Sequence, residues 1–166
     1  MRRRTGAQAE ILVVDDNAGK RLAITTVLEQ LGHTIVEVDS GEAALRAVME
    51  RTFAVILLDV QMPVMDGYET ARFIRMRSDC AHTPIIFVTA HSAEESKIPV
   101  AYASGAVDFI FAPIIRDILR AKVTVFVELF LKSRALERSV REFRDTFNRA
   151  AWRCSATPNG RARPAC

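Results

Sequence analysis

Cysteine is scarce in this chain of 166 residues, and the spacing of the few cysteines argues against a metal site. Cys80, Cys154 and Cys166 neither share metal-ligand spacing nor pair evenly, which suits a reducing compartment. No apolar run approaches the roughly 18 residues of a membrane span. The basic start, Met1–Arg4, precedes polar residues and not the apolar core of a signal peptide. We therefore expect a cytoplasmic protein without a membrane partner.

A strong excess of one charge is also missing. The formal net charge is +3, and basic residues concentrate at the two ends, at Arg2–Arg4 and at Arg161 and Arg163. Acidic and basic residues alternate between these ends, so the sequence does not indicate a nucleic-acid-binding face. With 49% apolar residues, a chain of this length can build one domain with a full core.

Short apolar runs alternate with amphipathic stretches along most of the chain. The runs are rich in β-branched or aromatic residues, and several are apolar almost throughout, as strands buried on both faces of a parallel sheet must be. They are ILVV (11–14), TIVEV (34–38), AVILLDV (54–60), IIFVT (85–89) and VDFIF (107–111). Because helical patterns separate them, we predict an α/β fold, a doubly wound five-stranded parallel sheet of the flavodoxin-like order 2-1-3-4-5.

Capping residues mark the ends of the predicted helices. Gly32 offers a C-cap to the first helix, and Ser40 can cap the second. Asp66 opens a third helix, which we expect to run to about Arg77. The fourth helix is expected to be short, with Pro99 in its first turn.

The last helix is predicted to extend well beyond the sheet, because residues 114–152 contain no glycine or proline. Its apolar residues fall at heptad spacing: Leu119, Phe126, Val140 and Phe147 share one position, interrupted by Ser133, and Leu129, Leu136 and Phe143 share the other, interrupted by Lys122. One interpretation is an ordinary packing helix followed by a solvated tail. The interpretation we prefer is an extended C-terminal helix that continues as a two-stranded coiled coil. The protein would then be a homodimer through the face of the last strand and helix and through this long helix.

These patterns divide the chain into four segments. We expect a basic arm, a folded domain, a helical connector and a disordered tail, at residues 1–9, 10–130, 131–152 and 153–166 respectively.

Polar side chains stand where the predicted strands end. The first strand leads to Asp15 and Asp16, the third to Asp59, and the fourth to Thr89. The carboxyl ends of neighbouring parallel strands meet at the switch point of the sheet, so the three carboxylates should converge. Their repulsion requires raised pKa values or a bound cation, and an oxygen-only cluster suits Mg²⁺. For an Asp-Asp pair without Asp59, a helix cap would be the simpler interpretation.

An aspartate that faces a metal ion can be a nucleophile toward phosphorus, forming an aspartyl phosphate. Asp59 is the candidate, and Thr89 could donate a hydrogen bond to a phosphoryl oxygen. A threonine at a strand end is more often only a β-former. A metal-dependent phosphatase is disfavoured because Gln61, and not a second aspartate, stands two residues after Asp59.

Four segments together resemble the receiver domain of two-component response regulators, over about residues 10–130. They are ILVVDDN, LLDVQMPVMDGYE, PIIFVTA and GAVDFIFAPI. The resemblance implies that Asp59 is the phosphoacceptor and that Asp15 and Asp16 lie on the metal side of the site. It also implies that the backbone carbonyl of Gln61 is a further Mg²⁺ ligand.

The same resemblance assigns Thr89 and Phe109 as a hydroxyl–aromatic switch pair and places a cis peptide before Pro113. The family pattern has a lysine immediately before that proline, where this chain has Ala112. By sequence, the nearest basic candidates are Lys20, His91 and Arg116.

Two functions stay open at this point. The first is a receiver that takes a phosphoryl group from a histidine kinase or phosphotransfer protein and at most hydrolyses it slowly. The second is a degenerate receiver that acts as a phosphorylation-independent dimerisation module, which the missing lysine favours. In addition, REFRDTFNRAAW (141–152) resembles the opening of a PAS sensory domain, which suggests a place within a larger signalling protein.

Overall fold

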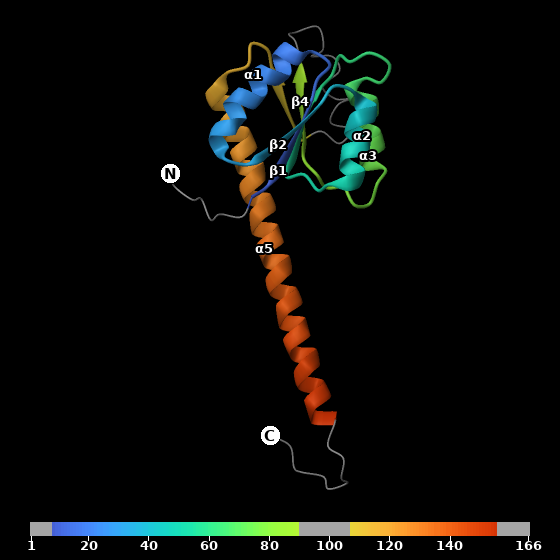
Figure 1. The fold of residues 1–166 in the computed structure, drawn as a ribbon, viewed down its shortest axis with the longest axis vertical. Helices are drawn as coiled ribbons and strands as arrows, with labels where there is room; N and C mark the ends of the chain where they lie inside the picture. Colours follow the sequence, from blue (N-terminus) through green and yellow to red (C-terminus); the bar gives the residue numbers. More distant parts are fainter. Residues whose placement is uncertain (1–7, 90–106, 156–166) are drawn as a thin grey trace. The chain divides into compact units, whose positions relative to one another are not determined.

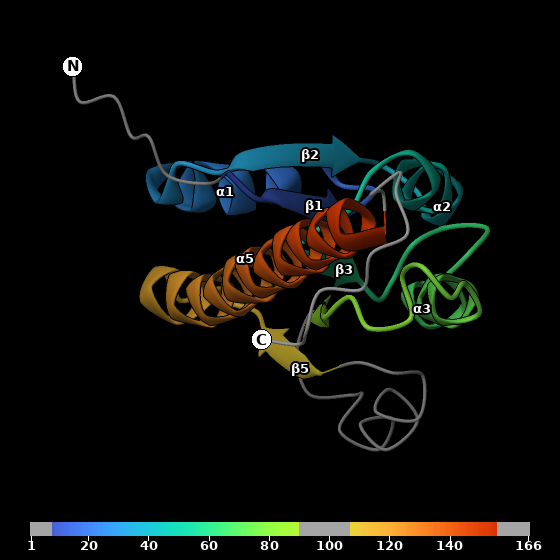
Figure 2. The ribbon, with the colours of Figure 1, turned by 90° about the horizontal axis from the view of Figure 1, so that it is seen from below.

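The computed structural model of the chain describes residues 8–89 and 107–155. Within them, five parallel strands form one sheet in the order β2-β1-β3-β4-β5, which confirms the predicted fold class (Figures 1 and 2). The strands are β1 (Glu10–Val14), β2 (Thr34–Val38), β3 (Val55–Asp59), β4 (Ile85–Thr89) and β5 (Asp108–Phe111). Each lies within one residue of its predicted run at either end, because the buried runs are apolar on both faces.

The helices of the described chain are α1 (Ala18–Leu28), followed by the short 3₁₀ helix η1 (Glu29–Leu31), then α2 (Gly41–Glu50), α3 (Gly67–Arg75) and α5 (Arg116–Ser155). Two of them, α2 and α3, begin directly after the predicted capping residues Ser40 and Asp66. The side chains of Asn17, Ser40 and Asp66 accept backbone N–H bonds at the starts of α1, α2 and α3. Gly32 ends η1 with a φ of 71°, a left-handed conformation that favours glycine.

Helix α3 ends two residues earlier than the predicted Arg77. The guanidinium of Arg75 donates to the backbone carbonyls of Ala81 and Thr83, at 3.0 and 2.6 Å. These bonds fold the following turn back toward the end of the helix. The end of α3 is therefore set by contacts with residues six and eight positions further along the chain. Helix propensity, which depends on local sequence, does not predict such contacts.

Helices cover both faces of the sheet (Figure 2). On one face, α1 and the first turns of α5 pack against β1, β3, β4 and β5, with Ile24, Leu28, Leu119 and Val123 in the core. On the other face, α2 and α3 contribute Ala44, Val48, Ala71 and Ile74 to a second core. In such sheets, ligands bind beyond the carboxyl ends of the strands.

The chain divides into two units, residues 1–131 and 132–166. In the first unit, α5 buries Leu119, Val123 and Val127 in the core, and Phe126 packs against it. Leu119 thus belongs to the domain core and Phe126 is partly buried against it, while the coiled coil stays a prediction. In the second unit the helix continues to Ser155, and its residues from 132 to 149 are exposed.

Several predicted segments lie partly or wholly outside the described residues. The fourth helix with Pro99, the basic residues 1–7 and residues 156–166 are among them. Ala9, assigned to the basic arm, is buried in the core, and residues 153–155, assigned to the disordered tail, are helical. No helix in the described part of the chain is long and apolar enough to cross a membrane.

The close approach of α3 to the end of β3 predicts the effect of a small substitution. A Cβ at Gly67 would collide with the backbone carbonyl oxygen of Asp59 and lie 2.9 Å from the Cα of Val60. Since backbone cannot move aside cheaply, Gly67→Ala should lower the free energy of unfolding by about 2–3 kcal/mol, measured by urea denaturation.

Gly19→Ala is the matched control for this substitution. Its Cβ would meet the side-chain oxygen of Asn17 at 3.2 Å, and α1 gains a better helix former. The free energy of unfolding should change by less than about 1 kcal/mol. Equal losses in the two variants would contradict the steric account of Gly67.

Candidate functional site

Three carboxylates converge at the carboxyl ends of β1 and β3. Asp15 directly follows β1, and Asp59 is the last residue of β3, the strand paired with β1 in parallel. One carboxylate oxygen from each of Asp15, Asp16 and Asp59 lies within 4.8 Å of the others. The convergence predicted from the strand order is therefore confirmed.

The loop after β1 holds Asp15 in a fixed position. Its side chain accepts a bond from the backbone N–H of Asn17 at 2.8 Å, and its own backbone N–H donates to Val38 at 3.3 Å. The guanidinium of Arg21, which also pairs with Glu37 at 3.8 Å, donates to the backbone carbonyl of Asp15 at 2.6 Å. The loop is thus ordered by contacts within the chain that do not involve a ligand.

Burial and mutual repulsion make the ionised site costly. Asp15 and Asp59 are only 0% and 2% exposed, whereas Asp16 is open to solvent. Burial raises the pKa of the Asp15 carboxyl above its ordinary value. Burial, and secondarily repulsion from Asp15, raise the pKa of Asp59 from 3.8 to about 6, while Lys20 opposes the rise.

The donor set fits a hard divalent cation. Asp15 Oδ2 and Asp59 Oδ2 are buried, and neither has a hydrogen-bond partner among the described residues. Such oxygens gain from a cation that replaces lost hydration, and carboxylates are the ligands that Mg²⁺ prefers. The exposed Asp16 completes an acidic site that is open on one side. Mg²⁺ would be held by Asp15, Asp16 and Asp59.

The predicted further ligand, Gln61, lies in the loop after β3 and is exposed. Its position two residues beyond Asp59 is compatible with a carbonyl ligand. The role of its backbone carbonyl as a Mg²⁺ ligand stays a prediction.

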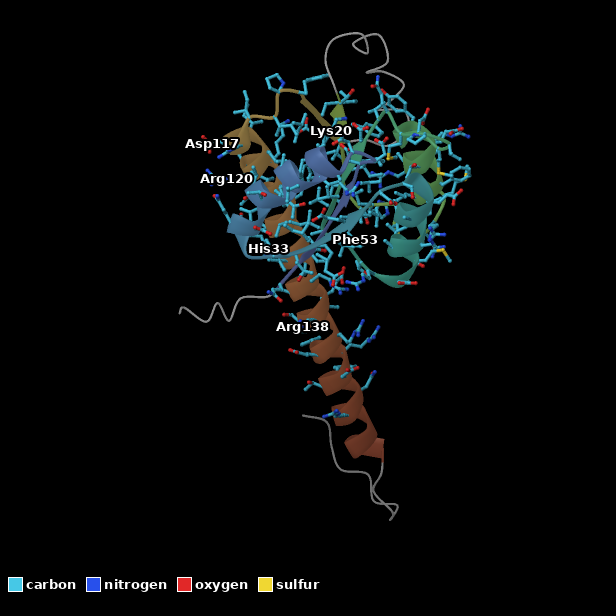
Figure 3. All side chains as sticks on the ribbon, turned by 45° about the horizontal axis from the view of Figure 1, so that its top comes forward. Lys20, His33, Phe53, Asp117, Arg120 and Arg138 are labelled. Carbon is cyan, nitrogen blue, oxygen red and sulfur yellow. The ribbon has the colours of Figure 1, made fainter. Side chains whose placement is uncertain are left out.

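A lysine reaches the acidic site from helix α1. Lys20 Nζ lies 3.6 Å from Asp59 Oδ1 and 3.9 Å from Asp15 Oδ2 (Figure 3). The sequence identified Lys20 only as one of three nearby basic residues. Its position five residues after Asp15, in the first turn of the following helix, is the signal that could have selected it.

Of the predicted switch residues, Thr89 is the last residue of β4 and Phe109 lies within the neighbouring strand β5. Thr89 is buried, and its backbone carbonyl accepts a bond from the N–H of Ala112 at 2.9 Å. The Ala112–Pro113 peptide is cis, as predicted. Phe109 pairs with Phe87 across β4 and β5, with ring centroids 5.6 Å apart, and is 9% exposed. Thr89 and Phe109 therefore lie on neighbouring strands, which their proposed coupling requires.

A cavity of about 860 Å³ opens beside these strand ends. It lies between α1 and the start of α5, and Lys20, Asp59, Thr89, Ala112 and Arg116 are among its lining residues. Since Asp59 and Lys20 both face it, a group attached to Asp59 has room to extend. His91, the remaining basic candidate, lies outside the described residues.

A doubly wound α/β domain with an acidic cluster at its switch point is the class that this fold and site define. Residues 11–124 match the response regulator receiver domain, and the chain belongs to that family.

Relatives place such domains in several kinds of signalling protein. The chain is 36% identical over 132 residues, 78% of its length, to the sensor histidine kinase GacS of Pseudomonas protegens, and 36% identical over 105 residues, 63% of its length, to the response regulator FleR of Pseudomonas aeruginosa. It spans only 14% of the first protein and 22% of the second.

Solved receiver domains have the same fold. The receiver domain of the sensor histidine kinase PA1611 from Pseudomonas aeruginosa, solved with a magnesium ion in its active-site cleft, has a TM-score of 0.67 and 30% identity, over 74% of this chain and 99% of that one. The chemotaxis protein CheY4 of Vibrio cholerae has a TM-score of 0.68 and 29% identity, over 72% and 99%.

The raised pKa of Asp59 predicts a stability that depends on pH. The folded protein binds more protons than the unfolded chain between the ordinary pKa of 3.8 and about 6. Stability from this group is therefore present below about pH 4 and is lost as pH rises through 6, by up to about 3 kcal/mol. Asp59→Asn removes the titrating carboxyl group. In EDTA, the free energy of unfolding of the native protein should therefore fall relative to that of the variant as pH rises from 4 to 7.

Mg²⁺ provides the second half of this experiment. At pH 7 it should stabilise the native protein, and stabilise Asp59→Asn by less, since one carboxylate ligand has been replaced. Urea unfolding of both proteins at four pH values, with EDTA or Mg²⁺, measures both effects. Parallel curves for the two proteins across pH 4–7 would contradict the buried-carboxylate account.

Proposed function

We propose that the domain is a phosphoacceptor module of a two-component phosphorelay, in which Asp59 takes a phosphoryl group from a histidine kinase or phosphotransfer protein. The observation that carries the proposal is the convergence of Asp15, Asp16 and Asp59 at one edge of the sheet. A buried aspartate held close to two further carboxylates destabilises the fold. Such an arrangement is typical of a functional site, and phosphoryl transfer with a divalent cation is a function that requires it.

The chemistry needs little from the protein beyond placement. A carboxylate oxygen of Asp59 attacks phosphorus of a phosphohistidine, an O–P bond forms, and the P–N bond breaks. The imidazole leaves and takes up a proton from solvent. Bound Mg²⁺ would offset the charge of the phosphoryl oxygens. Asp15 and Asp16 hold the cation site, and Thr89 would donate its hydroxyl to a phosphoryl oxygen from the end of β4.

The nucleophile must be ionised to attack, and although the pKa of Asp59 is raised to about 6, it is still below 7, so most of the carboxyl is ionised near pH 7. A bound divalent cation would increase the ionised fraction further. The site thus combines a buried, weakly solvated carboxylate with the charge that the reaction requires. The degenerate-receiver alternative predicts that phosphorylation is absent or has no consequence.

Incubation with acetyl phosphate and Mg²⁺ tests this proposal. One phosphoryl group should attach to the native protein, detected by intact mass, and EDTA should abolish it because the carboxylates and the phosphoryl group repel one another. Asp59→Asn should stay unmodified, whereas Asp66→Asn, a capping aspartate outside the site, should react like the native protein. Modification that persists in Asp59→Asn would overturn the assignment.

We also propose that the distal part of α5 is a homodimer seam. In the unit that begins at residue 132, Leu136, Val140, Phe143 and Phe147 are between 60% and 75% exposed. Their spacing alternates between four and three residues, the pattern of a two-stranded coiled coil. An apolar stripe of this length favours a second copy of the helix. The predicted PAS start at 141–152 fits the same proposal, since such a helix would connect signalling modules.

Light scattering tests the seam. The native protein should be a dimer at about 100 μM, and Leu136→Glu combined with Phe143→Glu should give monomers, because charge at heptad core positions is strongly unfavourable. Ala135→Glu with Arg138→Gln changes the net charge equally but lies outside the stripe, and should remain dimeric. A native protein that is monomeric at this concentration would contradict the proposal.

A further inference from the structure

The Lys20 side chain enters the acidic site from the first turn of α1 (Figure 3). Its ammonium forms ion pairs with both buried carboxylates, at 3.6 Å from Asp59 and 3.9 Å from Asp15. The side chain is 44% exposed, so its stem remains free to reposition the charge. The Lys20 ammonium is therefore held beside the two carboxylates but can move when the charge on Asp59 changes.

The position of Lys20 is electrostatically unfavourable without these carboxylates. Its backbone N–H donates to the capping side chain of Asn17, which places Lys20 in the first turn of α1. A helix N-terminus is the positive end of the helix dipole and favours acidic residues, yet the first turn of α1 has none. The attraction that offsets this arrangement comes from the acidic site itself.

Two neighbouring arginines, Arg21 and Arg120, have contacts outside the acidic site. Arg21 binds the backbone carbonyl of Asp15 and the carboxylate of Glu37. Arg120 pairs with Asp117 on the outer side of α5, as Figure 3 shows, and donates to Gln30. Both anchor structure, whereas the contacts of the Lys20 ammonium are with the site carboxylates.

Ala112 leaves open the place at which a longer side chain would approach. The same cavity is lined by Ala112, Lys20, Asp59 and Thr89. The backbone N–H of Ala112 donates a hydrogen bond to the backbone carbonyl of Thr89. The end of β5 therefore contributes a methyl group to the cavity, while α1 contributes an ammonium. A phosphoryl group on Asp59 would bring more negative charge into this space than the carboxylate it replaces.

We propose that Lys20 binds the phosphoryl group on Asp59, and thereby supplies from α1 the positive charge that Ala112 cannot supply from the end of β5. This inference rests on the proposed phosphoacceptor function. Without a phosphoryl group, the ammonium offsets part of the negative charge of Asp59 and Asp15. When the phosphoryl group forms, the ammonium shifts to its oxygens as a charge-assisted hydrogen-bond donor.

Beryllofluoride with Mg²⁺, a stand-in for the phosphoryl group, tests the inference. Its apparent Kd is measured from NMR shifts of the Thr89 and Phe109 amides in the native protein and in variants. Lys20→Gln should weaken binding roughly 10- to 150-fold, the range typical of losing a hydrogen bond to a charged group. Lys20→Arg, which keeps the charge, should stay within about fivefold, a small change on the free-energy scale.

Two further variants separate a specific contact from general charge. Arg46→Gln, on the exposed side of α2, removes the same charge and should leave the Kd within about twofold, as screened distant charges do. Arg116→Gln removes the rival cation at the cavity wall. If Arg116→Gln weakens binding and Lys20→Gln does not, α5 supplies the charge and the proposal is overturned.

Ala112→Lys gives an independent measurement, which can be made both with Lys20 present and with Lys20→Gln. In the otherwise native protein it should tighten binding by less than about threefold, because the site already holds a cation; combined with Lys20→Gln it should restore at least about tenfold. A gain of tenfold or more in the native background would overturn the proposal.

The failure of this inference can be told apart from failure of the phosphoacceptor function. If the native protein neither binds beryllofluoride nor is phosphorylated, both ideas fall together. If the native protein is phosphorylated on Asp59 and Lys20→Gln binds beryllofluoride equally well, only the role of Lys20 is wrong.

Discussion

The repulsion between Asp15 and Asp59 is the constraint to which the rest of the site responds. Two unit charges no more than 4.8 Å apart repel by about 3 kcal/mol or more at an effective dielectric of about 20. Both groups are buried, so solvent relieves little of this cost. A raised pKa, the ammonium of Lys20 and a divalent cation are three ways to reduce it. The chain has the first two built in and a donor set that fits the third.

The fold makes this repulsion unavoidable. Parallel pairing of β1 with β3 brings Val14 opposite Leu58, so the residues that follow meet at one edge. Gly67 lets α3 approach the backbone of Asp59 closely, and its N–H donates to the Val60 carbonyl at 3.0 Å. The carboxylates consequently have little freedom to separate. The repulsion lowers the stability of the fold, and positive charge bound at the site would recover part of that stability.

The sequence predicts the strands and the three carboxylates well, because both follow from local patterns. Buried runs are visible as apolar letters, and strand order decides which ends are neighbours. The end of α3 is different, since Arg75 reaches carbonyls beyond the helix. Phe126 fits a heptad equally well whether a second copy or its own domain covers it. The reach of Lys20 into the site depends on side-chain placement, which residue spacing does not specify.

We propose that one acidic site, with Lys20 as its resident cation, receives the phosphoryl group. A crystal structure of the native protein with Mg²⁺ and beryllofluoride tests it most directly. The account predicts beryllium attached to Asp59, Mg²⁺ on Asp15 and Asp16, and Lys20 Nζ within about 3 Å of a fluorine, the length of a charge-assisted hydrogen bond. Beryllofluoride bound at Asp59 with Lys20 directed into solvent, or contacted by Arg116 in its place, would contradict it.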